Sequence, residues 1–224
     1  MGASGRVSVI IPWAPGVGCR HREAALAWTA SKWVGTGHEV VVGENTGPWC
    51  KAAAVADGLA RATGDVLVVA DADVWTPGWE GAVGRVVSGV PWAMPHGKVH
   101  RLTHAATQQV LDGHEPAREM DLTQSPYQGW PGGGMVVVRR DVYERAPRFV
   151  GWSGEYDSWA HALRALAGPG WRGTAPLWHL WHPPQERMSR RWGSHAARAL
   201  ATRYARARTR ERMRALLDEA HQPV

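Results

Sequence analysis

Short apolar runs alternate with helical segments in the first third of the chain, and this alternation limits the possible folds more than any other feature. The runs are 7–12, 39–43 and 66–75, each rich in Val or Ile. Runs of this length are typical of strands that are buried on both faces. Helical patterns at 24–33 and 50–62 lie between them. The order strand, helix, strand, helix, strand predicts an α/β domain with a mostly parallel sheet and right-handed crossovers.

The strongest chemical signal is the pair Asp71 and Asp73, which ends the apolar part of the run 66–75. Side chains alternate along a strand, so residues two apart leave its end on the same side. Ligands of open α/β sheets bind at the carboxyl ends of strands, and paired carboxylates there suit a hard divalent cation that neutralises a diphosphate. A buried strand followed by an Asp-rich turn, closed at 76–78, explains the same residues without any ligand.

The rest of the chain is less regular. Residues 91–128 are rich in His, Pro and Gln and show little periodicity, which predicts loops and one short helix around 103–111. The later elements that the pattern predicts are a strand at 135–138 after three glycines, a helical turn at 140–144 and a helix at 158–167.

Positive charge is concentrated near the C-terminus. The whole chain has 26 basic and 20 acidic residues, whereas residues 185–214 contain ten Arg against two Glu. Such a segment is usually a solvated helical face, and it could also attract a phosphate backbone or an anionic surface. Apolar residues recur there at multiples of four, which predicts one face of a basic helix: Met188, Trp192, Leu200 and Tyr204.

A chain of 224 residues is long enough for one large α/β domain. We expect this domain to cover 1–184, with 185–224 as a basic helical extension packed on the same domain. No apolar run is long enough to span a bilayer, and residues 1–6 lack the apolar core of a signal peptide, so we expect a cytoplasmic protein without a transmembrane segment. Cys19 and Cys50 are too few to suggest a disulfide framework.

Taken together, these segments resemble the nucleotide-sugar glycosyltransferases of the GT-A fold, near the family-2 enzymes. Residues 7–12 resemble their opening strand, 39–45 their second strand and nucleoside loop, and 71–73 their metal-binding Asp-x-Asp motif. Residues 132–157 are similar to a catalytic segment shared by β-1,4-galactosyltransferases and polypeptide N-acetylgalactosaminyltransferases. The resemblance covers about 6–184 and implies a Rossmann-like, mostly parallel sheet flanked by helices, followed here by the C-terminal basic helix.

The resemblance implies a donor site built from loops at the strand ends. Glu44 or Asn45 would lie beside the nucleoside, and Arg20 or Arg22 could approach the diphosphate, although an ordinary solvated loop explains these arginines equally well. Glycines at 132–134 would let the backbone approach the sugar closely. The residues implied to bind the donor are Pro12, Arg20, Arg22, Glu44, Asn45, Lys51, Asp71, Gly133, Gly134 and Trp152. A buried tryptophan such as Trp152 is more often a core residue.

The same resemblance implies a bound Mn²⁺ or Mg²⁺. Asp73 would bind the cation directly, and Asp71 would contact the donor ribose or the cation through water. His182 resembles the late histidine ligand of these enzymes, with His179 as the second choice. Pro183 indicates an extended segment, in which two histidines three residues apart need not converge. Two carboxylates and an imidazole suit Mn²⁺ or Mg²⁺ better than zinc.

At the catalytic position the sequence departs from the family pattern. Where the family motif continues Glu-Asp, this chain has Glu155, Tyr156 and Asp157. A neutral tyrosine with a pKa near 10 is a poor base at neutral pH, so Glu155 or Asp157 is the candidate catalytic base. Acidic residues that cap the following helix are a competing explanation. An inverting or a retaining outcome remains open.

These observations predict a metal-dependent glycosyltransferase, either a hexosyl- or an N-acetylhexosaminyltransferase, that uses a nucleotide sugar, with a UDP-sugar implied by the resemblance. The acceptor hydroxyl would belong to a glycan, a lipid-linked glycan or hydroxylated DNA bases held by the Arg-rich helix. The alternative is a catalytically silent module on the same scaffold that binds a nucleotide or nucleic acid, which Tyr156 favours. A Rossmann dehydrogenase is a third interpretation, but no Gly-x-Gly-x-x-Gly follows the first strand.

Overall fold

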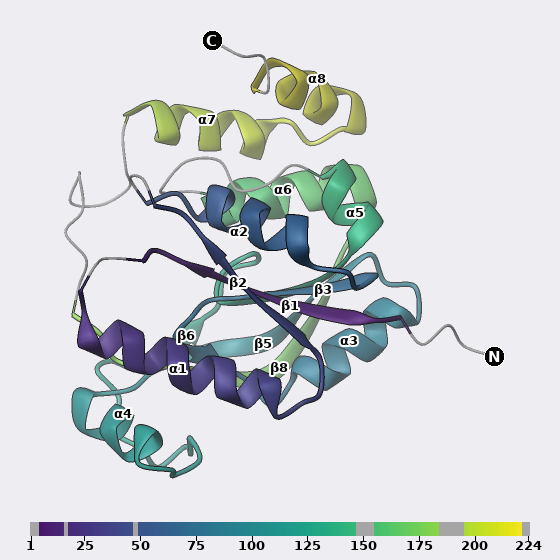
Figure 1. Ribbon diagram of the computed structural model, residues 1–224. Helices are drawn as coiled ribbons and strands as arrows, with labels where there is room; N and C mark the ends of the chain where they lie inside the picture. Colours follow the sequence, from purple (N-terminus) through teal and green to yellow (C-terminus); the bar gives the residue numbers. More distant parts are fainter. Residues whose placement is uncertain (1–4, 16–17, 47–48, 147–154, 184–194, 221–224) are drawn as a thin grey trace.

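A central β-sheet lies between two layers of helices in the computed structural model (Figure 1). The structure describes residues 5–15, 18–46, 49–146, 155–183 and 195–220. The strands are β1 (Val7–Trp13), β2 (Glu39–Glu44), β3 (Val66–Ala70), β4 (Val74–Trp75), β5 (Trp92–Arg101), β6 (Tyr127–Gln128), β7 (Met135–Arg139) and β8 (Trp171–His179). The helices are α1 (Arg20–Val34), α2 (Lys51–Arg61), α3 (Trp79–Val87), α4 (His104–Leu111), α5 (Arg140–Arg145), α6 (Glu155–Ala167), α7 (His195–Arg206) and α8 (Arg210–Ala220).

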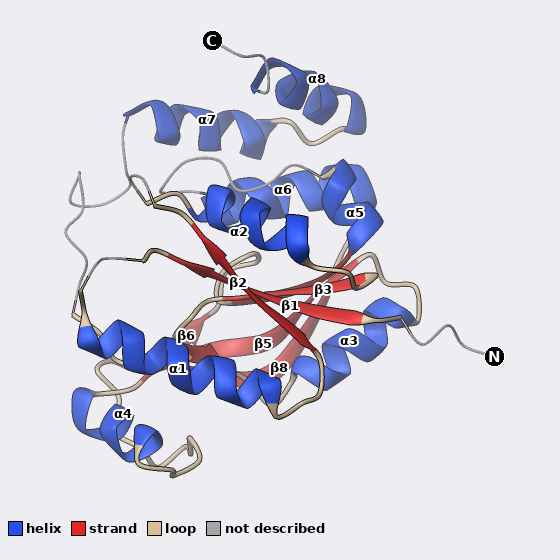
Figure 2. Ribbon diagram, in the orientation of Figure 1, coloured by secondary structure: helices blue, strands red, loops and turns tan. Residues whose placement is uncertain are grey.

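The sheet has the strand order β2-β1-β3-β7-β5-β8-β4, and β6 pairs with β5. Strand β1 is parallel to both β2 and β3, and β5 is parallel to β8. Strand β7 is antiparallel to both β3 and β5, so β1, β2, β3, β5 and β8 all run in one direction. This confirms the predicted mostly parallel sheet flanked by helices (Figure 2).

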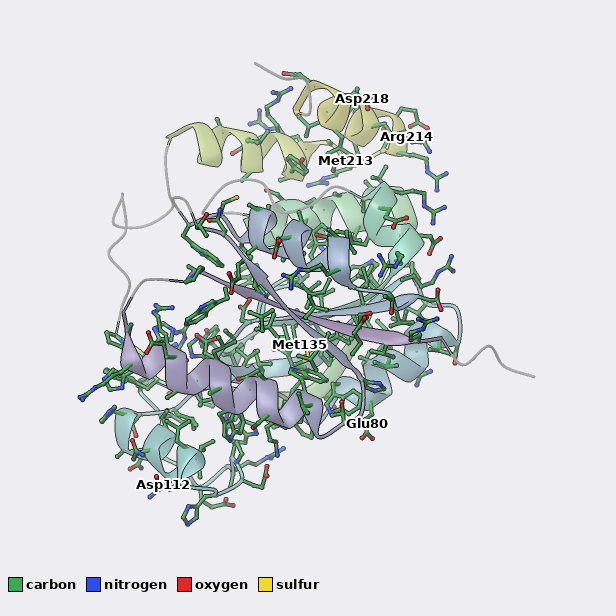
Figure 3. All side chains as sticks on the ribbon, viewed as in Figure 1. Glu80, Asp112, Met135, Met213, Arg214 and Asp218 are labelled. Atoms are coloured by element: carbon green, nitrogen blue, oxygen red, sulfur yellow. The ribbon has the colours of Figure 1, made fainter. Side chains whose placement is uncertain are left out.

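The two faces of the sheet bury different residues because side chains alternate along each strand. Val9 and Val68 belong to the cluster that packs under α1 and α3. Ile10 and Leu67, their neighbours along the strands, belong to the cluster that packs under α2, α5 and α6. Figure 3 shows Met135, which is fully buried, inside the sheet region. The continuous apolar runs of the sequence are therefore strands that are covered on both faces.

One prediction for the middle of the chain is wrong. The segment 91–128, predicted to be loops around a short helix, contains the long strand β5 as well as α4. Periodicity misses β5 because Pro95, His96 and Gly97 interrupt its apolar pattern. The ladder with β8 shifts register between Met94 and His96, and such an irregularity tolerates a proline that cannot donate a hydrogen bond.

The basic C-terminal helix predicted from the sequence is present as two helices, α7 and α8. They pack on α6 through a cluster that includes Ala162, Tyr204 and Met213 (Figure 3). The predicted face is confirmed in part, because Leu200 and Tyr204 pack in this cluster. Met188 and Trp192 lie outside the described residues. Within the described part of the chain, no helix is long and apolar enough to cross a membrane.

Candidate metal and donor site

A turn and a short strand place Asp73 beside the end of β8. Strand β3 ends before residues 71–73, which turn into β4. The backbone N–H of Leu180 donates to the carbonyl of Asp73 at 2.9 Å. Val74 pairs with His179 in the antiparallel ladder of β4 and β8. These backbone contacts bring the Asp73 carboxylate next to the residues that end and follow β8.

Three side chains at this place present metal-ligating atoms to one another. Nε2 of His182 lies 3.0 Å from Oδ2 of Asp73, and Nε2 of His179 lies 3.9 Å from the same oxygen. One ligand atom from each residue lies within 4.8 Å of the other two. The three side chains are only 15–16% exposed. The cluster is therefore shielded from bulk water and has an N,N,O donor set that a divalent cation can use.

Backbone carbonyls contact the other nitrogen of both imidazoles. Nδ1 of His179 lies 2.8 Å from the Leu180 carbonyl oxygen, and Nδ1 of His182 lies 2.9 Å from that of Pro183. In the tautomer that donates from Nδ1, Nε2 keeps its lone pair and faces Asp73. Histidines that bind metals commonly have this arrangement, because the carbonyl fixes the tautomer and the ring orientation.

Arg22 reaches the same cluster from α1. Its Nη2 lies 2.9 Å from Nδ1 of His182 and 3.4 Å from the Pro183 carbonyl oxygen. A guanidinium only donates, so the contact with Nδ1 requires this nitrogen to be unprotonated. Donation from Nδ1 to Pro183 and acceptance from Arg22 are therefore two alternative states of His182.

The pKa values of Asp73 and His179 are both shifted in the direction that favours metal binding. Burial disfavours the carboxylate of Asp73, but the imidazoles of His179 and His182 outweigh this effect, and the pKa of Asp73 is well below its usual value. Arg22 acts in the same direction. Burial lowers the pKa of His179 more than the charge of Asp73 raises it. An ionised carboxylate beside a neutral imidazole is the form that binds a cation.

Asp71 contacts different partners. Its Oδ1 accepts a hydrogen bond from Nζ of Lys51, the first residue of α2. Its backbone N–H donates to the carbonyl of Gly134 at 2.8 Å. The side chain of Lys51 is 3% exposed and that of Asp71 is 24% exposed. Because a turn carries both aspartates, the alternation of side chains along a strand does not set their directions, and Asp71 lies outside the three-residue cluster of the described chain.

Pro12, Glu44 and Asn45 lie together where β1 and β2 end. The two strands pair in parallel as far as Trp13 and Glu44. The backbone N–H of Asn45 donates to the Trp13 carbonyl at 3.0 Å, and its side-chain Oδ1 accepts from the N–H of Cys50 at 3.0 Å. The side chain of Asn45 thus ties the predicted nucleoside loop to the start of α2, next to Lys51.

Gly134 belongs to the same region through its contact with Asp71. Its φ is +68°, and a Cβ at this position would lie 2.5 Å from Cδ2 of Leu177. Both the backbone conformation and the close approach therefore require glycine. The structure brings Gly133 and Gly134 to the edge of the turn at 71–73, as a loop beside the donor would need.

Several predicted site residues do not join this group. Arg20 is exposed at the start of α1. Trp152 lies outside the described residues. Glu155 and Asp157 form the first turn of α6, and their side chains lie outside what the structure describes. Their roles stay predictions.

His179, the second choice of the sequence analysis, lies in the same cluster as His182. The prediction that the two histidines need not converge considered only local spacing, and in the structure their ring centroids lie 5.3 Å apart. The pairing of β4 with β8 places His179 near Asp73, and this long-range register leaves no local pattern. The one available signal was that the apolar run before 179 ends at His179 and is followed by His182 and Pro183.

No protein-family model matches the sequence, and no curated protein matches it. Among solved structures, the chain is similar to GalNAc-T7 in complex with UDP, GalNAc and Mn²⁺, with a TM-score of 0.52 and 13% identity over 91% of this chain and 48% of that chain. It is also similar to glucosyl-3-phosphoglycerate synthase from Mycobacterium tuberculosis in complex with Mn²⁺, UDP and phosphoglyceric acid. That match has a TM-score of 0.48 and 16% identity over 99% of this chain and 81% of that chain.

The likeness to GalNAc-T7 shows the fold. The chain has the GT-A fold of nucleotide-sugar glycosyltransferases, as its sequence predicted. It spans about half the length of GalNAc-T7, with 48% of that chain covered.

Proposed function

We propose that this protein is a metal-dependent glycosyltransferase that moves a sugar from a nucleotide sugar, a UDP-sugar by analogy with the contents of the GalNAc-T7 structure, to an acceptor hydroxyl. The observation that carries the proposal is the cluster of Asp73, His179 and His182. It lies at the end of β8 in a fold that nucleotide-sugar glycosyltransferases use. The sugar that we propose is a hexose or an N-acetylhexosamine.

Asp73, His179 and His182 would hold Mn²⁺ or Mg²⁺, with Asp71 as a further ligand through water or as a contact of the ribose. The structure supplies two imidazoles and one carboxylate instead of the two carboxylates and one imidazole expected from the sequence. This set suits Mn²⁺ better than Mg²⁺, which prefers oxygen ligands. Both imidazoles can aim Nε2 at the position that Oδ2 of Asp73 also faces. A bound divalent cation would neutralise the diphosphate and stabilise it as a leaving group.

Two positively charged side chains can also help to neutralise the diphosphate. In the Nδ1-protonated state of His182, Arg22 loses its contact with that nitrogen and is available to a phosphate oxygen. Lys51 is buried beside Asp71 and next to the predicted nucleoside loop. We assign Arg22 and Lys51 to the donor diphosphate and ribose, with Glu44 and Asn45 beside the base and Pro12 beneath it.

The transfer forms a bond between the anomeric carbon and the acceptor oxygen and breaks the bond between that carbon and the diphosphate oxygen. The diphosphate leaves with the bonding electrons, and the acceptor proton moves to a base. Glu155 or Asp157, in the first turn of α6, is our candidate for this base. Gly133, Gly134 and Trp152 are assigned to the sugar.

We further propose that residues 1–184 form the transferase domain and that 185–224 is an extension of it. For the acceptor we propose a glycan, as the resemblance to the family implies. Use of hydroxylated DNA bases stays a prediction. Some of the C-terminal arginines have partners within the protein, because Arg203 pairs with Glu219 and Arg210 donates to the Leu166 carbonyl at 3.1 Å.

The proposal is tested by incubating the protein with a panel of nucleotide sugars and measuring nucleoside diphosphate release with Mn²⁺ and with a chelator. We expect slow release from one donor that stops when the metal is removed. A metal-dependent thermal shift with the nucleotide but no release, with any acceptor tried, would favour the silent binding module that Tyr156 suggests. A protein that shows neither nucleotide release nor a thermal shift would contradict the proposal.

A further inference from the structure

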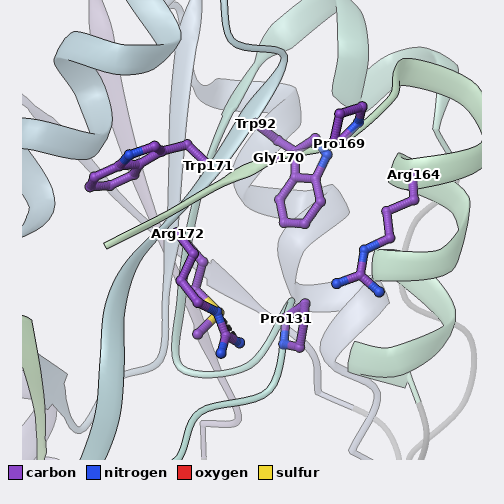
Figure 4. Close-up of a pocket in the computed structure, with 8 residues that line it drawn as sticks. Trp92, Pro131, Arg164, Pro169, Gly170, Trp171 and Arg172 are labelled. Carbon is purple, nitrogen blue, oxygen red and sulfur yellow. Dashed lines mark hydrogen bonds between the residues drawn. The ribbon is translucent and has the colours of Figure 1, made fainter. Parts of the chain in front are cut away.

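A hollow of about 410 Å³ lies between the start of β8, the start of β5 and the C-terminal half of α6 (Figure 4). Arg164 of α6 and Arg172 of β8 extend into it from two different elements. The hollow is large enough for a small ligand, because ligand pockets measure roughly 300–1,000 Å³. Apolar surface between the two arginines comes from Trp92, Met94, Pro131 and Pro169.

The contacts of the two arginines within the described part of the chain are with neutral groups. Among the described residues, no carboxylate forms an ion pair with Arg164 or Arg172. Arg172 donates instead to the carbonyl of Gly129 at 2.6 Å and lies 3.5 Å from the sulfur of Met94, and both partners are neutral. Burial and then the positive charge of Arg164 lower the pKa of Arg172. Two like charges that face one hollow repel each other, and a bound anion would relieve this repulsion.

A second arginine-lined hollow in the molecule is different. It lies between α5, α6 and α8, and Arg139 and Arg145 are part of its lining. Both of them pair with Asp141, at 2.6 Å and 2.7 Å. A carboxylate of the protein therefore already occupies these two arginines. Arg210 and Arg214 also line this second hollow, and Arg210 donates to the Leu166 carbonyl at 3.1 Å. Arg164 and Arg172 differ from Arg139 and Arg145 in that they face their hollow without a carboxylate partner among the described residues.

The hollow is connected to the donor site by two elements. Pro131 lines it, and Gly134, which accepts the N–H of Asp71, is three residues later in the chain. Three residues span at most about 10 Å. Helix α6 begins at Glu155, the candidate base, and Arg164 is nine residues further along the same helix, which corresponds to about 14 Å. A molecule of this length could have one end in the hollow and a hydroxyl at the donor.

We propose that the hollow between Arg164 and Arg172 binds an anionic group, a phosphate or a carboxylate, of the acceptor. This inference rests on the proposed transferase function. The guanidinium planes supply paired donors for the oxygens of the anion. The indole of Trp92 is fixed by donation from Nε1 to the Gly168 carbonyl at 3.0 Å and presents apolar surface to the body of the acceptor. The substrate class is thus an acidic acceptor rather than a neutral sugar.

Binding of the anion is tested first with inorganic phosphate, by titration calorimetry on the full-length protein without donor. We expect Arg164→Gln and Arg172→Gln each to weaken phosphate binding at least about tenfold, because each removes hydrogen bonds to a charged group. Arg145→Gln, in the other hollow, is the matched control and should bind like the wild type. Arg164→Lys should restore part of the affinity.

Equal phosphate affinity in the wild type and in both Arg164 and Arg172 variants would overturn the inference, as would the absence of phosphate binding by the wild type. Loss of binding in Arg145→Gln alone would place the anion in the other hollow and would also overturn it. Because Arg172 bonds to the Gly129 carbonyl, thermal unfolding of its variant must be measured. Arg164 and Arg172 are both exposed, and Arg164, which does not bond to this carbonyl, supplies the decisive variant.

The acceptor role is tested with matched pairs long enough for the span between the hollow and the donor site, a disaccharide phosphate against the same disaccharide, and a disaccharide that ends in glucuronate against the one that ends in glucose. With the active donor, we expect only the acidic members to accelerate nucleotide release, and Arg164→Gln to remove that acceleration while Arg145→Gln keeps it. Acceleration by the neutral members alone would contradict the acceptor role. If no donor reacts under any condition, the transferase function fails, whereas the phosphate titration still decides whether the hollow binds an anion.

Discussion

Asp71 and Asp73 are two residues apart, but they have different neighbours. Asp71 pairs with the buried ammonium of Lys51 on α2, whereas Asp73 faces the imidazoles of His179 and His182 at the end of β8. The first environment is an ion pair, and the second is a set of metal-ligating atoms. The difference teaches that the two carboxylates of one Asp-x-Asp pattern can have separate partners. In the proposed function, Asp71 would serve the nucleotide and Asp73 the cation.

The largest effect is expected from Asp73→Ala. This change removes the anionic member of the cluster and leaves two imidazoles, so we expect metal-dependent donor turnover to fall by about 100-fold or more, because several kcal/mol of charge stabilisation are lost with the cation. Turnover is measured as nucleoside diphosphate release in excess Mn²⁺. Circular dichroism checks the fold, and Glu80→Ala, an exposed change on α3, is the control. Full turnover in Asp73→Ala would contradict the assignment of the metal to Asp73 and would leave the two aspartates without different roles.

The two histidines are expected to differ in degree. His182→Ala should weaken Mn²⁺ binding by roughly 10- to 100-fold, and His179→Ala should weaken it less, because Nε2 of His179 lies 3.9 Å from the Asp73 oxygen against 3.0 Å for His182. Isothermal titration with Mn²⁺ measures both affinities. The same affinity in both variants and the wild type would mean that neither imidazole is a ligand.

On the other side of the comparison, Lys51→Met should act on the nucleotide rather than on the metal. We expect UDP affinity to fall about tenfold, because a buried cation next to the nucleoside loop is lost, while Mn²⁺ affinity without nucleotide changes little. Stability should also fall, by about 1–3 kcal/mol, since Asp71 loses its charged partner. Urea unfolding and UDP titration measure the two effects. A large loss of Mn²⁺ affinity would show that the two aspartates share one site.

The smallest effect is expected from pH. Protons compete with the cation for the imidazoles, so Mn²⁺ affinity should fall as the pH is lowered. Burial lowers the pKa of His179, so this residue stays neutral below the ordinary imidazole pKa of about 6.5, and only a few-fold loss is expected between pH 7.5 and 6. Titrations at several pH values measure the profile. A constant affinity down to pH 5 would exclude histidine ligands.

The sequence predicts the parts of this molecule that depend on local pattern. The buried strands around Val9 and Val68, helix α2 and the fold class follow from apolar runs and their order. The candidates Asp73 and His182 follow from the resemblance to a family. Strand β5 escapes prediction because its pairing with β7 and β8 overrides an unfavourable composition around Pro95.

Side-chain direction escapes prediction as well. The turn at 71–73 separates the two carboxylates, and the β4–β8 register, which joins residues far apart in the chain, brings His179 to Asp73. Arg164 and Arg172 also share no motif, and they line one hollow because the short connection at 168–170 joins the end of α6 to the start of β8 (Figure 4). Contacts of this kind depend on tertiary packing and leave no periodic signal.

The most direct test of the central claim is a Mn²⁺ titration of the wild type, Asp73→Ala and Asp71→Asn, followed by electron paramagnetic resonance of free Mn²⁺. We predict one tightly bound Mn²⁺ in the wild type, its loss in Asp73→Ala, and its retention with modestly lower affinity in Asp71→Asn. Equal binding by wild type and Asp73→Ala would contradict the assignment of the metal to Asp73, His179 and His182.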